Sequence, residues 1–276
     1  MPTPSEYINR AAVIIVTGGS SGIGCSIIKA ILSMGPSACV CNLSRSKPDV
    51  LLDKNGIHIS TDLSDAVSLR SAAEQLAEII DGSGEGTVLL FNNSGFGAYG
   101  KFHQLDRDKQ LNMIDLNIRA MVDLTARLLP QILQRGGAII NIASTAGFQP
   151  TPYLATYGAT KAFVLNWTLA LSEDLRGSSV QALAVCPGPT RSNFFKAAGF
   201  EIPPMGQGGG ASLDMTPDEV AGTTLRALAA GKSLVVTGWK NKCIAFFGSK
   251  TPIVAVTRLG GMILRKLRLE QHQQSK

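Results

Sequence analysis

Tyr157 and Lys161 are the two side chains whose types and spacing most directly suggest chemistry. They stand four positions apart in the small, apolar stretch "ATYGATKAFV" at residues 155–164. On a helix, residues at i and i+4 share a face, so the phenol and the ammonium would lie one above the other. A cation beside a phenol lowers the tyrosine pKa, and such a pair could transfer a proton near neutral pH. The plainer alternative is an amphipathic helix with a surface lysine and a half-buried tyrosine.

A glycine-rich turn, "TGGSSGIG" at residues 17–24, supplies a second chemical signal. It follows an apolar, β-rich run and opens a helical pattern. Gly18 suits a tight turn, while Gly22 and Gly24 let the backbone approach a pyrophosphate and let the helix pack on a sheet. The N-terminus of that helix would offer free N–H groups and a positive dipole end to phosphates. The pattern therefore predicts a dinucleotide site.

The turn after the second expected strand, "LSRSK" at residues 43–47, indicates which dinucleotide the site would bind. An acidic residue there would bind a free ribose 2′-hydroxyl, but Ser44, Arg45 and Ser46 stand in its place. Hydroxyls and a guanidinium suit a 2′-phosphate, so NADP(H) is favoured over NAD(H). The alternative is a solvated basic turn that binds nothing.

Apolar, β-rich runs alternate with helical patterns along the chain. Strands are expected at 12–18, 38–44, 56–63, 87–95, 136–144, 180–188 and 233–238. Helices are expected at 22–35, 65–80, 105–117, 118–135, 153–175 and 216–231. This alternation predicts an α/β fold, a Rossmann-like doubly wound parallel sheet of about seven strands with helices on both faces. No composition break divides the chain, so residues 1–276 are expected to form a single domain.

Composition narrows the classes of function. The 276 residues are 45% hydrophobic and 17% charged, with a net charge of +6 and a pI near 9.1. The basic residues are scattered except near the C-terminus, and no nucleic-acid partner is expected. Five cysteines without a CxxC pattern are expected to be reduced in a cytoplasmic protein, and three scattered histidines offer no metal-ligand spacing. No signal peptide or membrane-spanning run is apparent.

Taken together, these motifs resemble those of the short-chain dehydrogenase/reductase family over roughly residues 11–240. The glycine turn is similar to the family's TGxxxGxG motif, "NNSG" at 92–95 to its NNAG motif, and "YGATK" to its YxxxK motif. Asn117, Ser144 and "PGPTRS" at 187–192 also match in type and order. Ser94 and Ser192 stand where alanine and threonine are usual, and both are expected to be tolerated. Within the family, the chain looks most like bacterial oxidoreductases of unassigned substrate.

The resemblance implies a role for each matched residue. Tyr157 would be the general acid in carbonyl reduction, and Ser144 would polarise the same oxygen. Lys161 would lower the tyrosine pKa and hold the nicotinamide ribose, and Asn117 would anchor a water linking Lys161 to solvent. The implied cofactor contacts are Gly18, Ser20, Ser21, Gly22, Ile23, Gly24, Ser44, Arg45, Ser46, Asp62, Leu63, Asn93, Ser94, Gly95, Tyr157, Lys161, Pro187, Gly188, Thr190 and Ser192. The alternatives are structural, with Ser144 as a helix N-cap and Asn117 as a packed polar residue.

The substrate end of the site is less well defined by the sequence. Seven aromatic residues are expected near its mouth, namely Phe96, Tyr99, Phe102, Phe148, Tyr153, Phe194 and Phe195. They favour a small-molecule carbonyl or alcohol substrate of apolar character, although ordinary packing explains most of them equally well. The Gly- and Pro-rich segment 193–215 is expected to act as a substrate lid.

The C-terminal extension, residues 240–276, lies beyond the shared motifs. Its apolar residues recur at helical spacing among four basic ones, Arg258, Arg265, Lys266 and Arg268. Such a helix can lie on an anionic membrane, or it can pack on a second subunit or on the chain's own core. Packing on protein is the favoured interpretation. The glycine pair at 260–261 is expected to weaken a long continuous helix.

Three functions stay open at this point. The first is a cytoplasmic NADP-dependent carbonyl reductase or alcohol dehydrogenase, acting as the homodimer or homotetramer that the resemblance implies. The second is a membrane-associated reductase of lipid carbonyls, held peripherally at a membrane by the C-terminal extension. The third is a non-catalytic dinucleotide-sensing regulator, against which the intact set of Ser144, Tyr157 and Lys161 argues.

Overall fold

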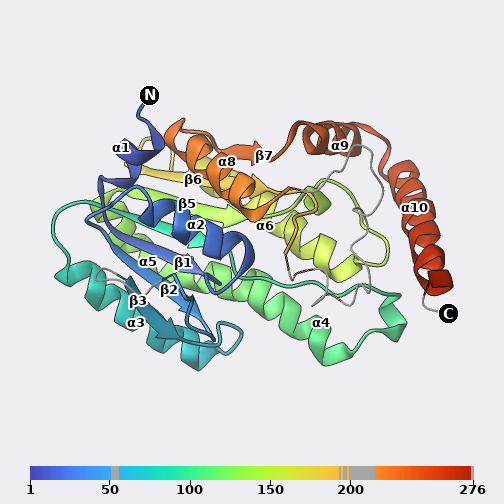
Figure 1. Cartoon of the computed structure of the whole chain (residues 1–276), viewed down its shortest axis with the longest axis horizontal. Coiled ribbons are helices and arrows are strands. Elements are labelled where there is room, and N and C mark those ends of the chain that lie inside the picture. The colour runs from blue at the N-terminus through green and yellow to red at the C-terminus, as the bar shows by residue number, and fades with distance from the viewer. Residues whose placement is uncertain (51–55, 193, 195–197, 199–214, 275–276) are drawn as a thin grey trace.

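Seven parallel strands form one sheet in the order β3-β2-β1-β4-β5-β6-β7 (Figure 1). This computed structural model describes residues 1–50, 56–192, 194, 198 and 215–274, with backbone alone for 266–274. The strands are β1 (Ala11–Thr17), β2 (Cys39–Ser44), β3 (Gly56–Ser60), β4 (Thr87–Asn92), β5 (Gly137–Ile142), β6 (Val180–Cys186) and β7 (Leu234–Val236). The predicted Rossmann-like parallel sheet is confirmed.

Helices cover both faces of the sheet. One face carries α1 (Pro4–Ile8), α2 (Gly22–Leu32) and α8 (Pro217–Ala229), and the other carries α3 (Ala66–Gly82), α5 (Ala120–Arg135) and α6 (Ala155–Asp174). Side chains alternate along a strand, so Ile14 and Val16 of β1 enter the first core while Val13 and Ile15 enter the second. Because both faces are covered, the strands are nearly continuous apolar runs.

Local sequence explains where several helices begin and end. The Asp65 carboxylate accepts a hydrogen bond of 2.8 Å from Ser68 N–H and caps α3. Thr216 and Glu219 form a reciprocal capping box at the start of α8, with a proline in its first turn. Gly35 follows α2 with φ of +64°, a conformation that favours glycine and ends the helical path.

The helices expected at 105–117 and 118–135 form one continuous helical run. The helix α4 (Arg107–Ile114) passes through a π-helical turn, Asp115–Arg119, directly into α5. A π-turn shifts the apolar pattern around the helix axis, and in the sequence this shift resembles a break between two helices. The two helical patterns predicted from the sequence correspond to α4 and α5, and the π-turn that joins them carries Asn117.

Two further helices, α9 (Trp239–Lys250) and α10 (Ile253–Gln274), follow β7 at one end of the molecule (Figure 1). The glycine pair at 260–261 does not interrupt α10. A side chain at either glycine would lie 3.6–3.8 Å from the Pro152 ring. That distance is an ordinary van der Waals contact, so this face of α10 lies beside the segment that precedes α6.

Candidate active site

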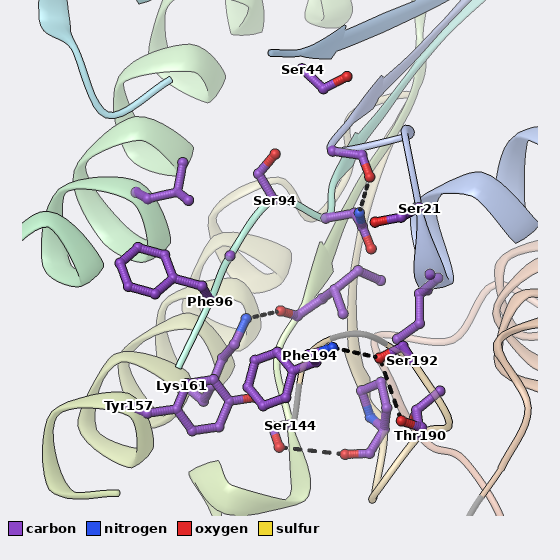
Figure 2. A pocket seen from close by; sticks show the side chains of 18 of the residues that line it. Ser21, Ser44, Ser94, Phe96, Ser144, Tyr157, Lys161, Thr190, Ser192 and Phe194 are labelled. Atoms are coloured by element: carbon purple, nitrogen blue, oxygen red, sulfur yellow. Dashed lines mark hydrogen bonds between the residues drawn. The ribbon is translucent and has the colours of Figure 1, made fainter. Parts of the chain in front are cut away.

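A cavity of about 700 Å³ opens at the carboxyl ends of the strands, between the loops that follow β1 and β4. The chain leaves these neighbouring strands toward opposite edges of the sheet, which is where ligands bind in open α/β sheets. Figure 2 shows Ser44 at one end of the cavity and Ser144, Tyr157 and Lys161 at the other. Two groups of predicted residues that are far apart in the sequence therefore line the same cavity.

The turn between β1 and α2 forms the middle of the cavity. Gly18 and Gly22 have φ of +68° and +56°, a region that other residues rarely adopt. The cavity wall here is made by Gly18, Ser20, Ser21, Gly22 and Ile23. The Ser21 side chain caps no N–H group of α2, so the positive end of this helix opens toward the cavity.

Gly24 lies behind the wall and controls how closely α2 packs on the turn. An added Cβ would stand 2.4 Å from the Gly18 carbonyl oxygen and 2.5 Å from Asn93 Nδ2. Gly24→Ala is therefore expected to displace α2 and destabilise the protein by about 1–3 kcal/mol, measured by thermal or denaturant unfolding. Gly82→Ala is the matched control in α3, because open space surrounds Gly82. Equal stability of the two variants would contradict this packing argument.

Asn42, on β2, connects the glycine turn with the basic turn. Its Oδ1 accepts a hydrogen bond of 2.8 Å from Gly19 N–H, and its Nδ2 donates one of 2.8 Å to Ser44 Oγ. Ser44 Oγ in turn donates to the Ser46 carbonyl at 2.7 Å. Sequence reasoning missed this fully buried asparagine. Its only signal was a polar residue in an apolar strand, and its partner Gly19 is distant in the sequence.

The residues expected around the adenosine end come together. Ser44, Arg45, Ser46, Asp62 and Leu63 all line this part of the cavity. The side-chain hydrogen bond from Ser64 holds the pKa of Asp62 below its ordinary value, and the charge of Arg45 lowers it further. An exposed guanidinium thus faces the cavity close to a carboxylate that stays ionised.

The loop after β4 crosses the cavity floor. Thr17 Oγ1 accepts hydrogen bonds from the N–H groups of Asn93 at 2.9 Å and Ser94 at 3.0 Å. Asn93 Nδ2 donates back to the Thr17 carbonyl at 2.9 Å. Thr17 therefore ties the ends of β1 and β4 together, which places Asn93, Ser94 and Gly95 in the wall.

Asn117 lies behind this loop and does not line the main cavity. Its Oδ1 accepts from Phe96 N–H at 3.1 Å, and its Nδ2 donates to the Phe96 carbonyl and to Thr160 Oγ1, each at 3.0 Å. The side chain thus holds the loop against α6, as the structural alternative expects. A second cavity of about 10 Å³ borders Asn117, Lys161 and Ser94, and this is about the volume that one water requires.

Tyr157 and Lys161 share a face of α6, but both are buried, with 9% and 6% of their surface exposed. The alternative with a surface lysine is therefore wrong. Lys161 Nζ donates a hydrogen bond of 2.7 Å to the Ile142 carbonyl at the end of β5 and lies 5.9 Å from the centre of the Tyr157 ring. The sheet, as well as the helix, positions this ammonium.

Burial decides the pKa of both groups. It raises the pKa of Tyr157 to about 12, against a smaller lowering by the hydrogen bond with Ser144. It also lowers the pKa of Lys161 to about 8. Burial dominates the pKa of Tyr157 because a buried phenolate loses its hydration, and the lowering expected from Lys161 does not appear in this structure.

Ser144 caps a helical turn, as the structural alternative expects, and its hydroxyl also lies beside the phenol of Tyr157. Its Oγ accepts from Ala146 N–H at 3.1 Å and caps the short 3₁₀ turn Thr145–Gly147. The same hydroxyl lies within hydrogen-bonding reach of Tyr157 and 3.5 Å from the Pro187 carbonyl (Figure 2). The cap thereby fixes the position of a hydroxyl beside the phenol.

The loop after β6 forms the wall opposite α6. Pro187, Gly188, Thr190 and Ser192 all line the cavity. Thr190 Oγ1 donates to the Gly188 carbonyl at 3.0 Å. A Cβ at Gly188 would stand 2.2 Å from Asn241 Oδ1, so α9 packs tightly on the outer side of this wall.

The substrate end of the cavity is apolar. Phe96 and Phe194, both predicted here, line it together with Ala146 and Leu154. The ring centres of Phe194 and Tyr157 are 5.2 Å apart. Ala146 and Leu154 carry no distinguishing sequence signal, and only the folded path from β5 to α6 brings them to the cavity.

Four of the other predicted aromatic residues do not line the cavity. Tyr99 and Tyr153 pack on each other with ring centres 6.0 Å apart, Phe148 packs against a core cluster beneath α6, and Phe102 is exposed. Ordinary packing, the alternative that the sequence left open, accounts for Tyr99, Tyr153 and Phe148.

The predicted lid at 193–215, together with Phe195, falls almost entirely outside the described residues. The exceptions are three residues, Phe194, Ala198 and Met215. The Ala198 carbonyl accepts a hydrogen bond of 2.8 Å from Tyr99 N–H. The lid therefore stays a prediction.

Comparison with known proteins agrees with this architecture. A model of the short chain dehydrogenase family matches residues 12–201. The chain is 34% identical over 194 residues to an uncharacterized short-chain type dehydrogenase/reductase of Sinorhizobium fredii, covering 69% of this chain and 75% of that protein. It is also 34% identical over 184 residues to a very-long-chain 3-oxoacyl-CoA reductase of Neurospora crassa, covering 63% of this chain and 55% of that protein.

The fold is similar to that of a short-chain dehydrogenase from Sphingobium yanoikuyae in complex with NADPH. That likeness has a TM-score of 0.70 at 27% identity and covers 81% of this chain and 86% of the other. The chain thus spans most of this solved structure, but only about half the length of the Neurospora reductase. The family match over most of the sequence, on the same fold, shows that this protein belongs to the short-chain dehydrogenase family.

Proposed function

We propose that this protein is an NADP(H)-dependent oxidoreductase that reduces a carbonyl group to an alcohol, or catalyses the reverse reaction. The observation that carries the proposal is the shared cavity, with Ser144, Tyr157 and Lys161 at one end and Ser44 and Arg45 at the other. Family membership supports an oxidoreductase with a dinucleotide cofactor. The choice of NADP(H) and the role of each residue rest on the chemistry of the cavity wall. A homodimer or homotetramer is part of the same proposal.

The residues present fit a dinucleotide with a 2′-phosphate. Gly18 and Gly22 leave room beside the open N-terminus of α2, where free N–H groups and the helix dipole suit a pyrophosphate. Arg45 and the hydroxyl of Ser46 suit a phosphate on the adenosine ribose, whereas the Ser44 hydroxyl already donates its proton to the Ser46 carbonyl. The NADPH complex of the Sphingobium relative supports the same choice.

When bound, NADPH supplies the hydride, and Tyr157 supplies the proton. With its pKa raised to about 12, the phenol is protonated at neutral pH. The phenol is still a stronger acid than the alcohol that forms. Alcohols are about as weakly acidic as water, whose pKa is about 15.7. Proton transfer to the developing alkoxide is therefore downhill, and carbonyl reduction needs no lowered tyrosine pKa. Ser144, beside the phenol, would donate a hydrogen bond to the same oxygen.

Lys161 would orient the nicotinamide ribose. Its ammonium has three donors, and the Ile142 carbonyl takes one of them, which leaves two for the cavity side. The small cavity beside Asn117 and Ser94 suits one water, through which Lys161 would exchange protons with solvent. The Ser94 hydroxyl, in place of the family's usual alanine, would give that water a further partner.

The proposed substrate is an apolar carbonyl compound. Phe96, Leu154 and Phe194 would exclude water from the reacting carbonyl and favour a hydrocarbon portion. The name of the Neurospora relative supports a carbonyl on an acyl chain as one candidate class.

Arg45→Ala tests the choice of cofactor. NADPH and NADH are titrated separately against the protein, following nicotinamide fluorescence. The NADPH Kd is expected to rise about 10–100-fold, because a hydrogen bond to a charged group contributes about 1.5–3 kcal/mol, while the NADH Kd changes little. Arg176→Ala is the control, since this exposed arginine lies just beyond the far end of α6.

Different outcomes separate the parts of the proposal. If the unaltered protein binds NADPH and NADH with equal affinity, the proposed preference for NADP(H) is wrong, while the proposed oxidoreductase activity still stands. Tight binding without hydride transfer to any carbonyl in a broad panel would favour the dinucleotide-sensing regulator instead.

A further inference from the structure

The helices α9 and α10 carry a surface that is both apolar and basic, here called the α9–α10 surface. Its large apolar side chains are between 51% and 71% exposed, and they are Trp239, Phe246, Phe247, Ile253, Val254, Leu259, Met262 and Ile263. Its basic residues are Lys240, Lys242, Lys250, Arg258 and Arg265. Exposed apolar side chains gathered on one part of a protein indicate an interaction site.

On α9, exposed and buried residues separate onto two faces. Trp239, Phe246 and Phe247 recur at helical spacing on the outer face, while Asn241 and Ala245 are buried on the inner face. The inner face is held in place by the close approach of Asn241 to the loop after β6. The outward direction of the aromatic rings therefore follows from how the helix is anchored.

The helix α10 is anchored in the same one-sided way. The glycine pair on its inner face lies beside Pro152, and Tyr99 Oη donates a hydrogen bond of 3.3 Å to the Leu264 carbonyl. Leu259 and Met262 lie on the outer face and are more than half exposed. These contacts with the rest of the chain cover the inner face of α10. Among the described residues, no element covers its outer face.

Charge indicates which partner fits this surface. Residues 239–265 contain five basic residues and no acidic one. A second copy seated symmetrically on the same surface would bring these like charges together, which opposes a symmetric dimer there. An anionic partner complements them. Aromatic and aliphatic side chains among lysines and arginines are the composition by which proteins adhere to anionic bilayers.

We propose that the α9–α10 surface binds an anionic phospholipid bilayer. The apolar side chains would enter the headgroup region while the basic ones pair with lipid phosphates. The chain would lie on the bilayer, since no helix in the described ranges has the length and hydropathy needed to cross it. Pro152, which lies beside α10, is two residues from Leu154 in the apolar cavity wall, so attachment would bring the substrate end of the cavity toward the lipid.

Vesicle co-sedimentation of the full chain tests this proposal. We expect binding to vesicles of phosphatidylcholine mixed with phosphatidylserine, weakened by added salt, and little binding to phosphatidylcholine alone. The double variant Lys242→Glu, Lys250→Glu is expected to lower the partition coefficient at least about tenfold. The double variant Phe246→Ser, Phe247→Ser is expected to lower it by a similar factor.

Matched changes elsewhere serve as controls. Arg70→Glu with Lys232→Glu makes the same change in charge at exposed positions outside the surface, and Val67→Ser removes an exposed apolar side chain from α3. All variants should melt within a few degrees of the unaltered protein. The measurement needs neither cofactor nor substrate, so its failure and the failure of the proposed oxidoreductase activity are distinguishable.

Three results would overturn the proposal. The first is equal binding to neutral and anionic vesicles, or binding to neither. The second is an equal loss of binding in the control variants. The third is a concentration-dependent dimer, seen by sedimentation without lipid, that Phe246→Ser, Phe247→Ser dissociates; the surface would then be an interface between copies of this chain.

Discussion

Tyr157→Phe is expected to lower kcat for carbonyl reduction by about 10²–10⁴-fold, with the NADPH Kd changed by no more than a few-fold. The substitution removes only the hydroxyl, so the ring keeps its buried site and its contact with Phe194. What disappears is the proton that the developing alkoxide takes up. Ser144 would still polarise the carbonyl, which accounts for the residual activity.

Steady-state oxidation of NADPH, followed by absorbance, measures this effect once a carbonyl substrate is found. Tyr7→Phe is the control, because Tyr7 is a partly buried tyrosine on α1 whose hydroxyl donates to Gln181 at 3.4 Å, on the far side of the sheet from α6. It should retain full activity. A Tyr157→Phe variant within about tenfold of the unaltered enzyme would exclude Tyr157 as the main proton donor.

Lys161→Met is expected to reduce activity by at least about 10²-fold and, independently, to remove a pH-dependent gain in stability. Burial lowers the pKa of Lys161 from its ordinary 10.5 to about 8. Below pH 8 the folded and unfolded chains both bind the proton, and the unfavourable burial of the ammonium is fully present. Between these two pKa values the unfolded chain keeps the proton that the folded chain releases, so the free energy of unfolding rises with pH.

Denaturant unfolding at pH 7.5 and pH 9.5 measures this linkage. The unaltered protein should gain on the order of 2 kcal/mol relative to Lys161→Met over that interval. The high pKa of Tyr157 acts in the opposite direction only above pH 10, and the tyrosine is present in both proteins. Lys232→Met, at an exposed lysine, should follow the unaltered protein. Parallel stability curves for Lys161→Met and the unaltered protein would contradict the inferred burial of the charge.

Local pattern was sufficient for the fold class and for the glycine turn. Apolar runs separated by helical periods predicted the seven parallel strands, whereas the grouping of this turn with Ser144 and Tyr157 was implied by the family resemblance. These features depend on short-range rules, namely the alternation of a strand, the period of a helix and the φ angles open to glycine. Such rules act over a few residues, so the sequence displays them directly.

The features that only the tertiary structure decided depend on contacts between segments that are far apart in the chain. Spacing predicted that Tyr157 and Lys161 share a face, but only the packing of α6 on β5 and β6 showed that both are buried, which reversed the expected pKa of the phenol. Asn42 on β2 acquired its role from Gly19, in the turn that follows the neighbouring strand β1. The outer face of α10 stays exposed because Pro152 and Tyr99 hold only its inner face. Desolvation and exposure depend on what surrounds a side chain in space, and a local sequence pattern does not contain that information.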